Sequence, residues 1–235
     1  MFHFKQFALH HARNGMKIGT DGVLLGAWST FPPNITHILD IGTGTGLLAF
    51  MLAQRFPHAH ITGLEPHPIN LQEAEGNLAH NTSFPGRIKF VAGRLQDYAH
   101  QSGAQFDGII CNPPFYQEKL QAEDPQRNMA RNLQFLPPED LFLGAQKLLK
   151  PGGVFNLIIP AELKARVLAT ATKTGFSLQT ECSVQGRSNK PIKRYLLQFV
   201  LGESAPRTPE SLVLEKAPRE SSEAHLKLVQ PFLLD

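Results

Sequence analysis

The stretch from Phe106 to Tyr116 holds the residues best suited to chemistry, because an apolar run there ends abruptly in Asn112, Pro113, Pro114 and Phe115. Neither proline carries an N–H group, so this corner offers hydrogen-bond acceptors and few donors. The Asn112 side-chain oxygen and the Pro113 carbonyl could both accept from an amino group, while the Phe115 ring could stack on a flat ring. An amine attached to an aromatic ring is the guest that fits these residues.

Holding both protons of such an amine would also change its reactivity. The nitrogen lone pair is normally conjugated into the ring, and two acceptors would draw the nitrogen towards a tetrahedral, nucleophilic geometry. Catalysis would then depend mostly on positioning and would need no strong general base. Taken alone, Asn-Pro-Pro is equally compatible with a tight turn at the exit of a strand, so the rest of the chain decides.

A glycine-rich turn supplies the second group of candidates. Gly42, Gly44 and Gly46 alternate after the apolar segment 37–41, so the backbone could turn sharply there and lie against a ligand. Glu65 ends the next apolar segment, nineteen positions after Gly46. A carboxylate at that place could accept hydrogen bonds from both ribose hydroxyls of a nucleoside-containing cofactor.

The spacing of the glycines narrows the choice of cofactor. A dinucleotide fingerprint would need its third glycine at position 47, which is Leu47, and no Gly-Lys-Ser/Thr of a Walker loop follows. The run Asp-x-Gly-x-Gly-x-Gly from Asp40 fits S-adenosylmethionine better. We expect Asp40 to orient the loop and Thr43 to lie with its glycines against the cofactor.

The segment before residue 30 contains a further candidate anion site. Gly19 precedes Thr20 and Asp21, which predicts a looped approach to a helix over about 21–28. Thr20 or Asp21 could simply be the N-cap of that helix. Alternatively, exposed N–H groups and Lys17 could hold an anionic group, because a helix N-terminus favours negative charge.

Strands and helices alternate along the rest of the chain. We expect strands at 37–41, 60–64, 87–92, 106–111, 154–159, 176–184 and 195–200, and helices at 47–56, 68–81, 138–150, 161–174 and 223–229. This alternation predicts an α/β fold with a Rossmann-like, doubly wound, mostly parallel sheet and an antiparallel last strand. We expect a single domain over 1–235, with a lead-in at 1–36, a core at 37–201 and a tail at 202–235.

Composition excludes several classes of protein. The 235 residues are 42% hydrophobic, enough for a full core, but no apolar run approaches the length of a membrane span. The start, MFHFKQF, lacks the long apolar centre of a signal peptide, so we expect a cytoplasmic protein. Cys111 and Cys182 have neither metal-site nor disulfide spacing. We expect reduced, structural thiols, no metal and no obligate protein partner.

Charge alone does not indicate nucleic-acid binding, because the formal net charge is only +3. Basic residues nevertheless gather after the Asn-Pro-Pro corner and around a late loop over 185–193, namely Arg127, Arg131, Arg187, Lys190, Lys193 and Arg194. Without other evidence, a solvated loop is the favoured explanation for the late group. The polar segment 117–134 shows no clear periodicity, and we expect it to be mobile and to contact substrate.

At this point the sequence resembles the class I S-adenosylmethionine-dependent methyltransferases, through DIGTGTG at 40–46 and NPPF at 112–115. The two motifs are similar to those of the methyltransferases that methylate exocyclic or amide nitrogens. More narrowly, the chain resembles the tRNA1(Val) adenosine N6-methyltransferase family, which modifies the adenosine just 3′ of the anticodon. That resemblance rests also on FKQF at 4–7, MKIGTDGVLLGAW at 16–28 and PQRNMAR at 125–131.

The resemblance implies a seven-stranded sheet with S-adenosylmethionine over 42–46, its ribose on Glu65 and its methionine end near 17–21. The adenine of the cofactor would lie beside Arg94, which stands where these enzymes often carry an acidic residue. Phe115, where tyrosine is frequent, would stack on the target base with help from Tyr116. The tRNA would be contacted by Arg127, Arg131, Lys190, Lys193 and Arg194.

The same corner could receive other sp² nitrogens, so a DNA adenine, a guanine amine of ribosomal RNA and a protein glutamine remain alternatives. A hypothesis of another class is a non-catalytic RNA-binding protein that retains the fold. A nicotinamide oxidoreductase is disfavoured by Leu47, which breaks the dinucleotide fingerprint.

Overall fold

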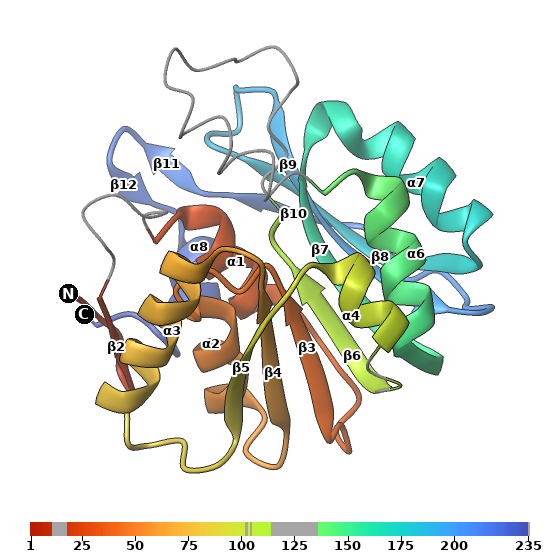
Figure 1. The fold of residues 1–235 in the computed structure, drawn as a ribbon. Helices are drawn as coiled ribbons and strands as arrows, with labels where there is room; N and C mark the ends of the chain where they lie inside the picture. The colour runs from red at the N-terminus through yellow and green to blue at the C-terminus, as the bar shows by residue number, and fades with distance from the viewer. Residues whose placement is uncertain (11–17, 102, 104, 114–135, 235) are drawn as a thin grey trace, which may run out of the picture.

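The computed structural model describes residues 1–10, 18–101, 103, 105–113 and 136–234, and its centre is a twisted sheet (Figure 1). Eight strands pair in the order β10-β8-β9-β7-β6-β3-β4-β5. They are β3 (His37–Ile41), β4 (His60–Glu65), β5 (Ile88–Ala92), β6 (Phe106–Cys111), β7 (Leu149–Pro160), β8 (Phe176–Gln185), β9 (Ile192–Leu201) and β10 (Glu210–Val213). The helices are α1 (Thr20–Trp28), α2 (Leu47–Arg55), α3 (Pro68–His80), α4 (Leu95–Gln101), α6 (Pro138–Leu148), α7 (Lys164–Lys173, after a 3₁₀ turn Ala161–Leu163) and α8 (Glu223–Val229).

The pairing of the strands confirms the predicted mostly parallel sheet. β3 pairs in parallel with β4 and β6, and β6 pairs in parallel with β7. β9 runs antiparallel to both β7 and β8. β8 therefore points the same way as β3, and the carboxyl ends of all strands except β9 lie at one edge of the sheet.

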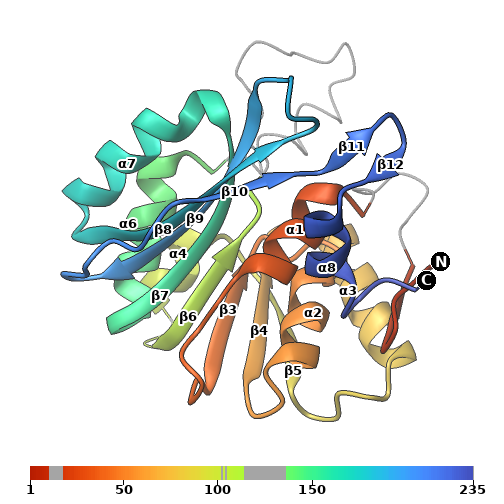
Figure 2. The same ribbon diagram turned by 180° about the vertical axis from the view of Figure 1, so that it is seen from behind.

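Helices cover both faces of the sheet because successive strand residues are apolar on both sides. Ile38 and Ile110 face the cluster that includes α1 and α2, whereas Leu39 and Ile109 face the cluster that includes α4, α6 and α7. Figures 1 and 2 show these two layers from opposite sides. This is the doubly wound arrangement that the alternation of elements predicted.

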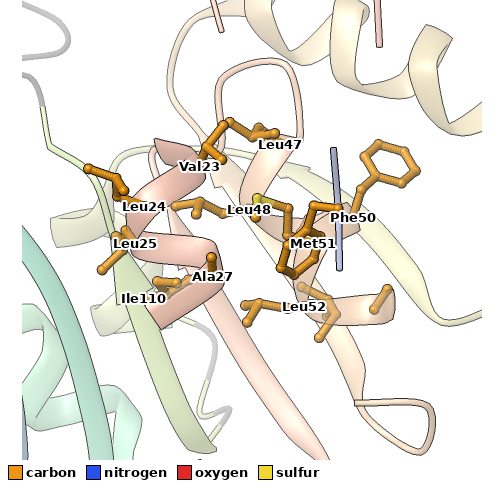
Figure 3. Close-up of a cluster of buried hydrophobic side chains, with 14 of the residues drawn as sticks. Val23, Leu24, Leu25, Ala27, Leu47, Leu48, Phe50, Met51, Leu52 and Ile110 are labelled. Carbon is orange, nitrogen blue, oxygen red and sulfur yellow. The ribbon is translucent and has the colours of Figure 1, made fainter. Parts of the chain in front are cut away.

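Close packing between α1 and α2 brings the N-terminal segment onto the sheet. Leu24, Leu25 and Leu48 meet there above Ile110, as Figure 3 shows. A Cβ atom added at Gly26 would stand 2.6 Å from the Met51 sulfur, so the two helices approach more closely than a side chain at position 26 permits. Glycine at this position lets α1 lie directly over the central strands.

The predicted helix over 138–150 ends two residues early, because α6 stops at Leu148 and Leu149 already pairs with Phe106 of β6. The register shifts before Gly108 pairs with Val154, so the intervening Pro-Gly-Gly lies inside β7 as an irregularity and does not separate the two elements. The proline and glycines predict a helix stop, whereas the pairing of Leu149 with Phe106 decides the boundary.

The tail after residue 202 is more structured than predicted. β10 pairs in parallel with β8 and extends the sheet to eight strands, so the implied count of seven is wrong. A small hairpin follows, formed by β11 (Glu215–Ala217) and β12 (Glu220–Ser221), and then the predicted helix α8. These strands are short and half-exposed, so no hydrophobic alternation marks them in the sequence.

Three further differences concern short elements. The late loop is shorter than 185–193, because β8 runs to Gln185 and β9 begins at Ile192. Helix α4 was not predicted, and neither was the hairpin of β1 (Phe2–His3) and β2 (Ala8–Leu9). Phe4 of this hairpin bridges to Leu233, so the two termini lie side by side (Figure 1).

No helix in the described part of the chain is both long and apolar enough to cross a membrane.

The aromatic centre of the second layer yields a stability prediction. The fully buried Phe142 ring contacts the rings of Phe155, Phe176 and Phe199 edge-on, with centroids 5.2–5.3 Å away. Phe142→Ala should lower the free energy of unfolding by about 3–5 kcal/mol, because it leaves a cavity among these rings. Urea denaturation measures this loss.

The adjacent Leu143 is the matched control, since its side chain is 48% exposed. Leu143→Ala should change the free energy of unfolding by no more than about 0.5 kcal/mol. Equal losses in the two variants would contradict the packing described for this layer.

Candidate active site

Three predicted groups of site residues lie together because the strands that carry them are neighbours. The glycine-rich loop follows β3, Glu65 ends β4, and Asn112 follows β6. Ile41 at the end of β3 pairs with Leu64 on one side and with Cys111 on the other. The site is thus at the carboxyl edge of the sheet, where open α/β folds bind their ligands.

The three loop glycines have left-handed backbones but different surroundings. Gly42, Gly44 and Gly46 have φ values of 69°, 57° and 91°. A Cβ atom at Gly42 or Gly44 would meet no atom of the described residues within 4 Å, whereas one at Gly46 would stand 2.9 Å from the Phe90 ring. Gly46 therefore allows the loop to pack on the core, and Gly42 and Gly44 present bare backbone to open space.

Glu65 holds the loop from the neighbouring strand. Its side chain is only 3% exposed, and its Oε2 accepts a hydrogen bond from the Gly44 N–H at 2.9 Å. Its Oε1 accepts from the His67 N–H at 3.0 Å and from the Asn70 amide at 3.2 Å. A carboxylate offers about four acceptor positions, so these three bonds leave one on Oε2.

Sequence reasoning did not find Asn70 or the part played by the His67 N–H. Asn70 lies in the first turn of α3 and is 8% exposed, so it is a buried polar residue that faces Glu65. Spacing along the chain does not reveal such a partner. The only available signal is an asparagine near the expected start of a helix that follows an acidic strand end.

Asp40 lies beneath the loop and is fully buried. Its Oδ2 accepts the Thr43 hydroxyl at 2.5 Å, which ties Asp40 to this turn, while its Oδ1 has no hydrogen-bond partner among the described residues. Burial raises the pKa of Asp40 to about 7, the Thr43 hydrogen bond opposes that rise, and the nearby Glu65 charge adds to it. Asp40 is therefore a carboxyl group that holds its proton close to neutral pH.

Asn112 lies beside the start of α1. Its side-chain nitrogen is 3.7 Å from the point where a Cβ atom at Gly22 would stand, and Pro113 next to it is buried. The side-chain amide of Asn112 makes no hydrogen bond within the described part of the chain. The helix predicted near 21–28 and the Asn-Pro corner thus meet at this edge.

Other predicted site residues lie outside the described residues: Lys17, Pro114, Phe115, Tyr116, Arg127 and Arg131, together with the polar segment 117–134.

The N-terminus of α1 differs from the expected capping pattern. Gly19 is the N-cap, and neither Thr20 nor Asp21 caps the helix, because the first helical residue is already Thr20. Asp21 instead accepts a 2.8 Å ion-pair hydrogen bond from Arg194 of β9. The structure therefore joins a residue predicted for the cofactor to one predicted for RNA.

The remaining predicted residues lie at the surface. Arg94 is exposed, and its carbonyl accepts the Tyr98 N–H at the start of α4. The preceding Gly93 donates its N–H to the Glu65 carbonyl at 3.1 Å, so this turn is next to the acidic strand end. Lys190 and Lys193 are exposed, and their ammonium groups contact none of the described acidic groups.

The described residues contain no group of three or more metal-ligating side chains. Cys111 and Cys182 are both free and buried. Burial raises the pKa of the Cys182 thiol to about 12 and that of Cys111 well above its usual range, and Asp40 adds to the effect at Cys111. Both remain neutral thiols at physiological pH.

Strand order, glycine-rich loop and acidic second strand together define a Rossmann-like methyltransferase fold, and comparison with solved structures agrees. A predicted O-methyltransferase from Agrobacterium tumefaciens is 19% identical, with a TM-score of 0.71 over 90% of this chain and 96% of the other. A methyltransferase from Pyrococcus furiosus is 20% identical, with a TM-score of 0.60 over 84% of this chain and 90% of the other. At these identities the likeness shows the fold.

Comparison with known sequences identifies the family more narrowly than the comparison of structures does. Residues 12–181 match the methyltransferase small domain family. The tRNA1(Val) (adenine(37)-N6)-methyltransferase of Vibrio vulnificus is 37% identical over 99% of this chain and 95% of its own length. That of Porphyromonas gingivalis is 40% identical over 99% of this chain and 94% of its own length. The chain belongs to the tRNA1(Val) (adenine(37)-N6)-methyltransferase family.

The buried Asp40 predicts a pH dependence of stability. Its pKa is about 7 in the folded protein but about 3.9 in an unfolded chain, so between these values the folded state holds a proton that the unfolded state has released. The contribution of this group to the free energy of unfolding therefore falls as the pH rises through that window.

Asp40→Asn removes this titration. The free energy of unfolding of the variant minus that of the original protein should increase from about pH 4 to about pH 7 and stay level above it. Urea denaturation of both proteins across this range measures the difference. A difference that does not change with pH would show that Asp40 ionises normally in the folded state.

Proposed function

We propose that this protein transfers a methyl group from S-adenosylmethionine to the exocyclic N6 of adenine 37 in tRNA1(Val). The observation that carries the proposal is the full-length similarity of 37–40% to enzymes named for that reaction, in a chain that keeps the Asn-Pro corner at the carboxyl edge of its sheet. The arrangement of the described residues supports the binding of the cofactor and of the amine in this reaction.

The glycine loop and Glu65 suit a nucleoside cofactor. Gly42 and Gly44 have open space above their α-carbons, so a flat or charged ligand could lie against the backbone without displacing a side chain. The free acceptor position of Glu65 Oε2 could take one ribose hydroxyl, and the other would compete with the existing partners of Oε1. When bound, S-adenosylmethionine supplies an electrophilic methyl group on a positively charged sulfur.

Asn112 and Pro113 would hold the amine that receives this methyl group. The amide oxygen of Asn112 is not engaged by the described residues, so it is available to accept one N6 proton, and the Pro113 carbonyl would accept the other. Two such bonds restrain the amine and draw its lone pair out of conjugation with the ring. The nitrogen loses one proton to solvent after the transfer, and the rate gain comes chiefly from orientation.

The target base must leave its neighbours to reach this corner. An adenine beside an anticodon is in a loop, so extrusion costs a few kcal/mol at most, which is comparable to the roughly 1–3 kcal/mol that stacking on an aromatic side chain returns. Phe115 and Tyr116 are proposed for that stacking, and Arg127 and Arg131 for the adjacent phosphates. The proposal for these four rests on their place in the sequence: Phe115 and Tyr116 directly follow the Asn-Pro-Pro corner, and the two arginines lie further along the same polar segment.

Replacement of Asn112 tests the reaction and the corner together. Incubation with labelled S-adenosylmethionine and unmodified tRNA1(Val), followed by digestion to nucleosides, should place the label in N6-methyladenosine. Asn112→Ala should reduce kcat by about 100-fold with little change in cofactor affinity, because the amine is then poorly oriented. Full activity of this variant at saturating tRNA would remove Asn112 from the mechanism.

A matched control and a second readout complete this experiment. Asn34 is exposed and precedes β3 at the opposite edge of the sheet, so Asn34→Ala should keep the original rate. Label recovered in DNA or in protein, but not in tRNA, would reassign the substrate to one of the other sp² nitrogens and leave the fold unaffected.

Glu65 provides a test of the cofactor site that does not need RNA. Glu65→Gln keeps the shape of the side chain but replaces one acceptor oxygen by a donor, so affinity for S-adenosylmethionine should fall about 10- to 100-fold, as expected for one charged hydrogen bond. Isothermal titration calorimetry measures this change. The exposed Glu75 of α3 is the control, and Glu75→Gln should bind as the original protein does.

A further inference from the structure

The turn between β11 and β12 has an unusual backbone. Ala217 pairs with Glu220, so Pro218 and Arg219 form a two-residue turn. The proline ring holds its own φ near −65°, and Arg219 has a φ of 64°. Arg219 is the one non-glycine residue with positive φ in the described part of the chain, where glycine occupies the nine other such positions.

An arginine is energetically unfavourable at this position of the turn. A proline followed by a residue with positive φ corresponds to a type II turn, whose third position favours glycine or asparagine. In the left-handed region the Cβ atom of any other residue crowds the backbone. Residues kept in such conformations are concentrated at binding sites, so the side chain of Arg219 calls for an explanation outside the turn.

The positive charge of Arg219 is not paired with any acidic group of the described residues. Its side chain is exposed and makes no hydrogen bond or ion pair with the described residues. The adjacent Glu220 is instead paired with Lys216 at 2.7 Å. Arg219 therefore presents an uncompensated guanidinium at the tip of a hairpin.

The hairpin is at the same edge of the sheet as Asn112. The Leu214 and Glu215 N–H groups donate to the carbonyls of Gln185 and Gly186, which places the base of the hairpin at the carboxyl end of β8. That end faces the same way as the ends of β3, β4 and β6. Figures 1 and 2 both show the hairpin beyond the N-terminal end of α1, on the same side of the molecule as the loop between β8 and β9.

Exposed cations of that loop add to the charge of the hairpin. Lys190 and Lys193 have no acidic partner among the described residues, and the acidic group at the base of the hairpin is Glu215. The guanidinium on the hairpin and the two ammonium groups on the neighbouring loop could each contact a phosphate of a nucleic-acid backbone. The planar guanidinium of an arginine can bind one phosphate through two parallel hydrogen bonds.

We propose that the tip of the β11–β12 hairpin, through Arg219, binds the phosphate backbone of the tRNA outside the target nucleotide, alongside Lys190 and Lys193. This inference rests on the proposed function, because it takes tRNA as the substrate. The turn presents this cation at the exposed end of the hairpin, where a phosphate could reach it.

Arg219→Gly tests this role, because glycine suits the turn and removes the charge. Binding of an unmodified tRNA1(Val) transcript to the full chain, measured by filter binding from 50 to 300 mM salt, should weaken about three- to tenfold at 0.15 M salt. The slope of log K against log salt should become shallower by about one. The melting temperature should be unchanged or higher, since the backbone strain is relieved. In the methylation assay KM for tRNA should rise with kcat unchanged.

Two control variants separate charge from turn geometry. Arg219→Lys keeps the positive charge and should retain most of the affinity and the salt slope. The exposed Lys89 of β5, at the other end of the sheet order, should be replaceable by alanine without effect on either quantity. Normal binding and slope for Arg219→Gly would overturn the hairpin proposal alone. Failure of the original protein to bind or methylate tRNA would overturn the proposed function, and the hairpin proposal with it.

Discussion

The Gly44 N–H and the Glu65 carboxylate form the hydrogen bond on which the geometry of the site depends. It joins the loop after β3 to the end of β4 at 2.9 Å, and the same carboxylate holds the start of α3 through the His67 N–H and the Asn70 amide. One buried side chain thus orients a loop, a strand end and a helix. A buried acceptor with this many donors is expensive to remove, because each donor would lose its partner in a place that water does not reach.

Packing beneath the loop enforces the same geometry from the other side. The Phe90 ring fills the space that side chains at Gly46 and Gly63 would need. The loop can therefore pack against the core only if both positions are glycine. Asp40 and Glu65 are then enclosed together, and the cost of burying two carboxyl groups appears as the raised pKa of Asp40. The glycine-rich loop is therefore held by buried polar side chains as well as by apolar packing.

The ion pair between Asp21 and Arg194 links the two sides of the molecule that the proposed reaction uses. α1 lies against the Asn112 corner, whereas β9 begins at the loop that carries Lys190 and Lys193. Arg194 is half-buried and occupied by this pair, so it positions α1, and its proposed contact with RNA would need that pair to open. Lys190, Lys193 and Arg219 make no ion pair with the described residues, and they lie on the projecting loop and hairpin, where phosphate could approach.

The sequence by itself determined the parallel core of the fold, because apolar strand runs, glycine-rich turns and amphipathic helices follow from local periodicity and turn chemistry. Strands 37–41 and 106–111 and helix 223–229 agree to the residue. It also indicated Asp40, Glu65 and Asn112, since polar residues that end parallel strands must meet at one edge. Only the tertiary structure decided the eighth strand, the Asn70 contact with Glu65 and the Asp21–Arg194 pair. These features depend on contacts between residues distant in the chain, and such contacts leave no period or spacing in the sequence.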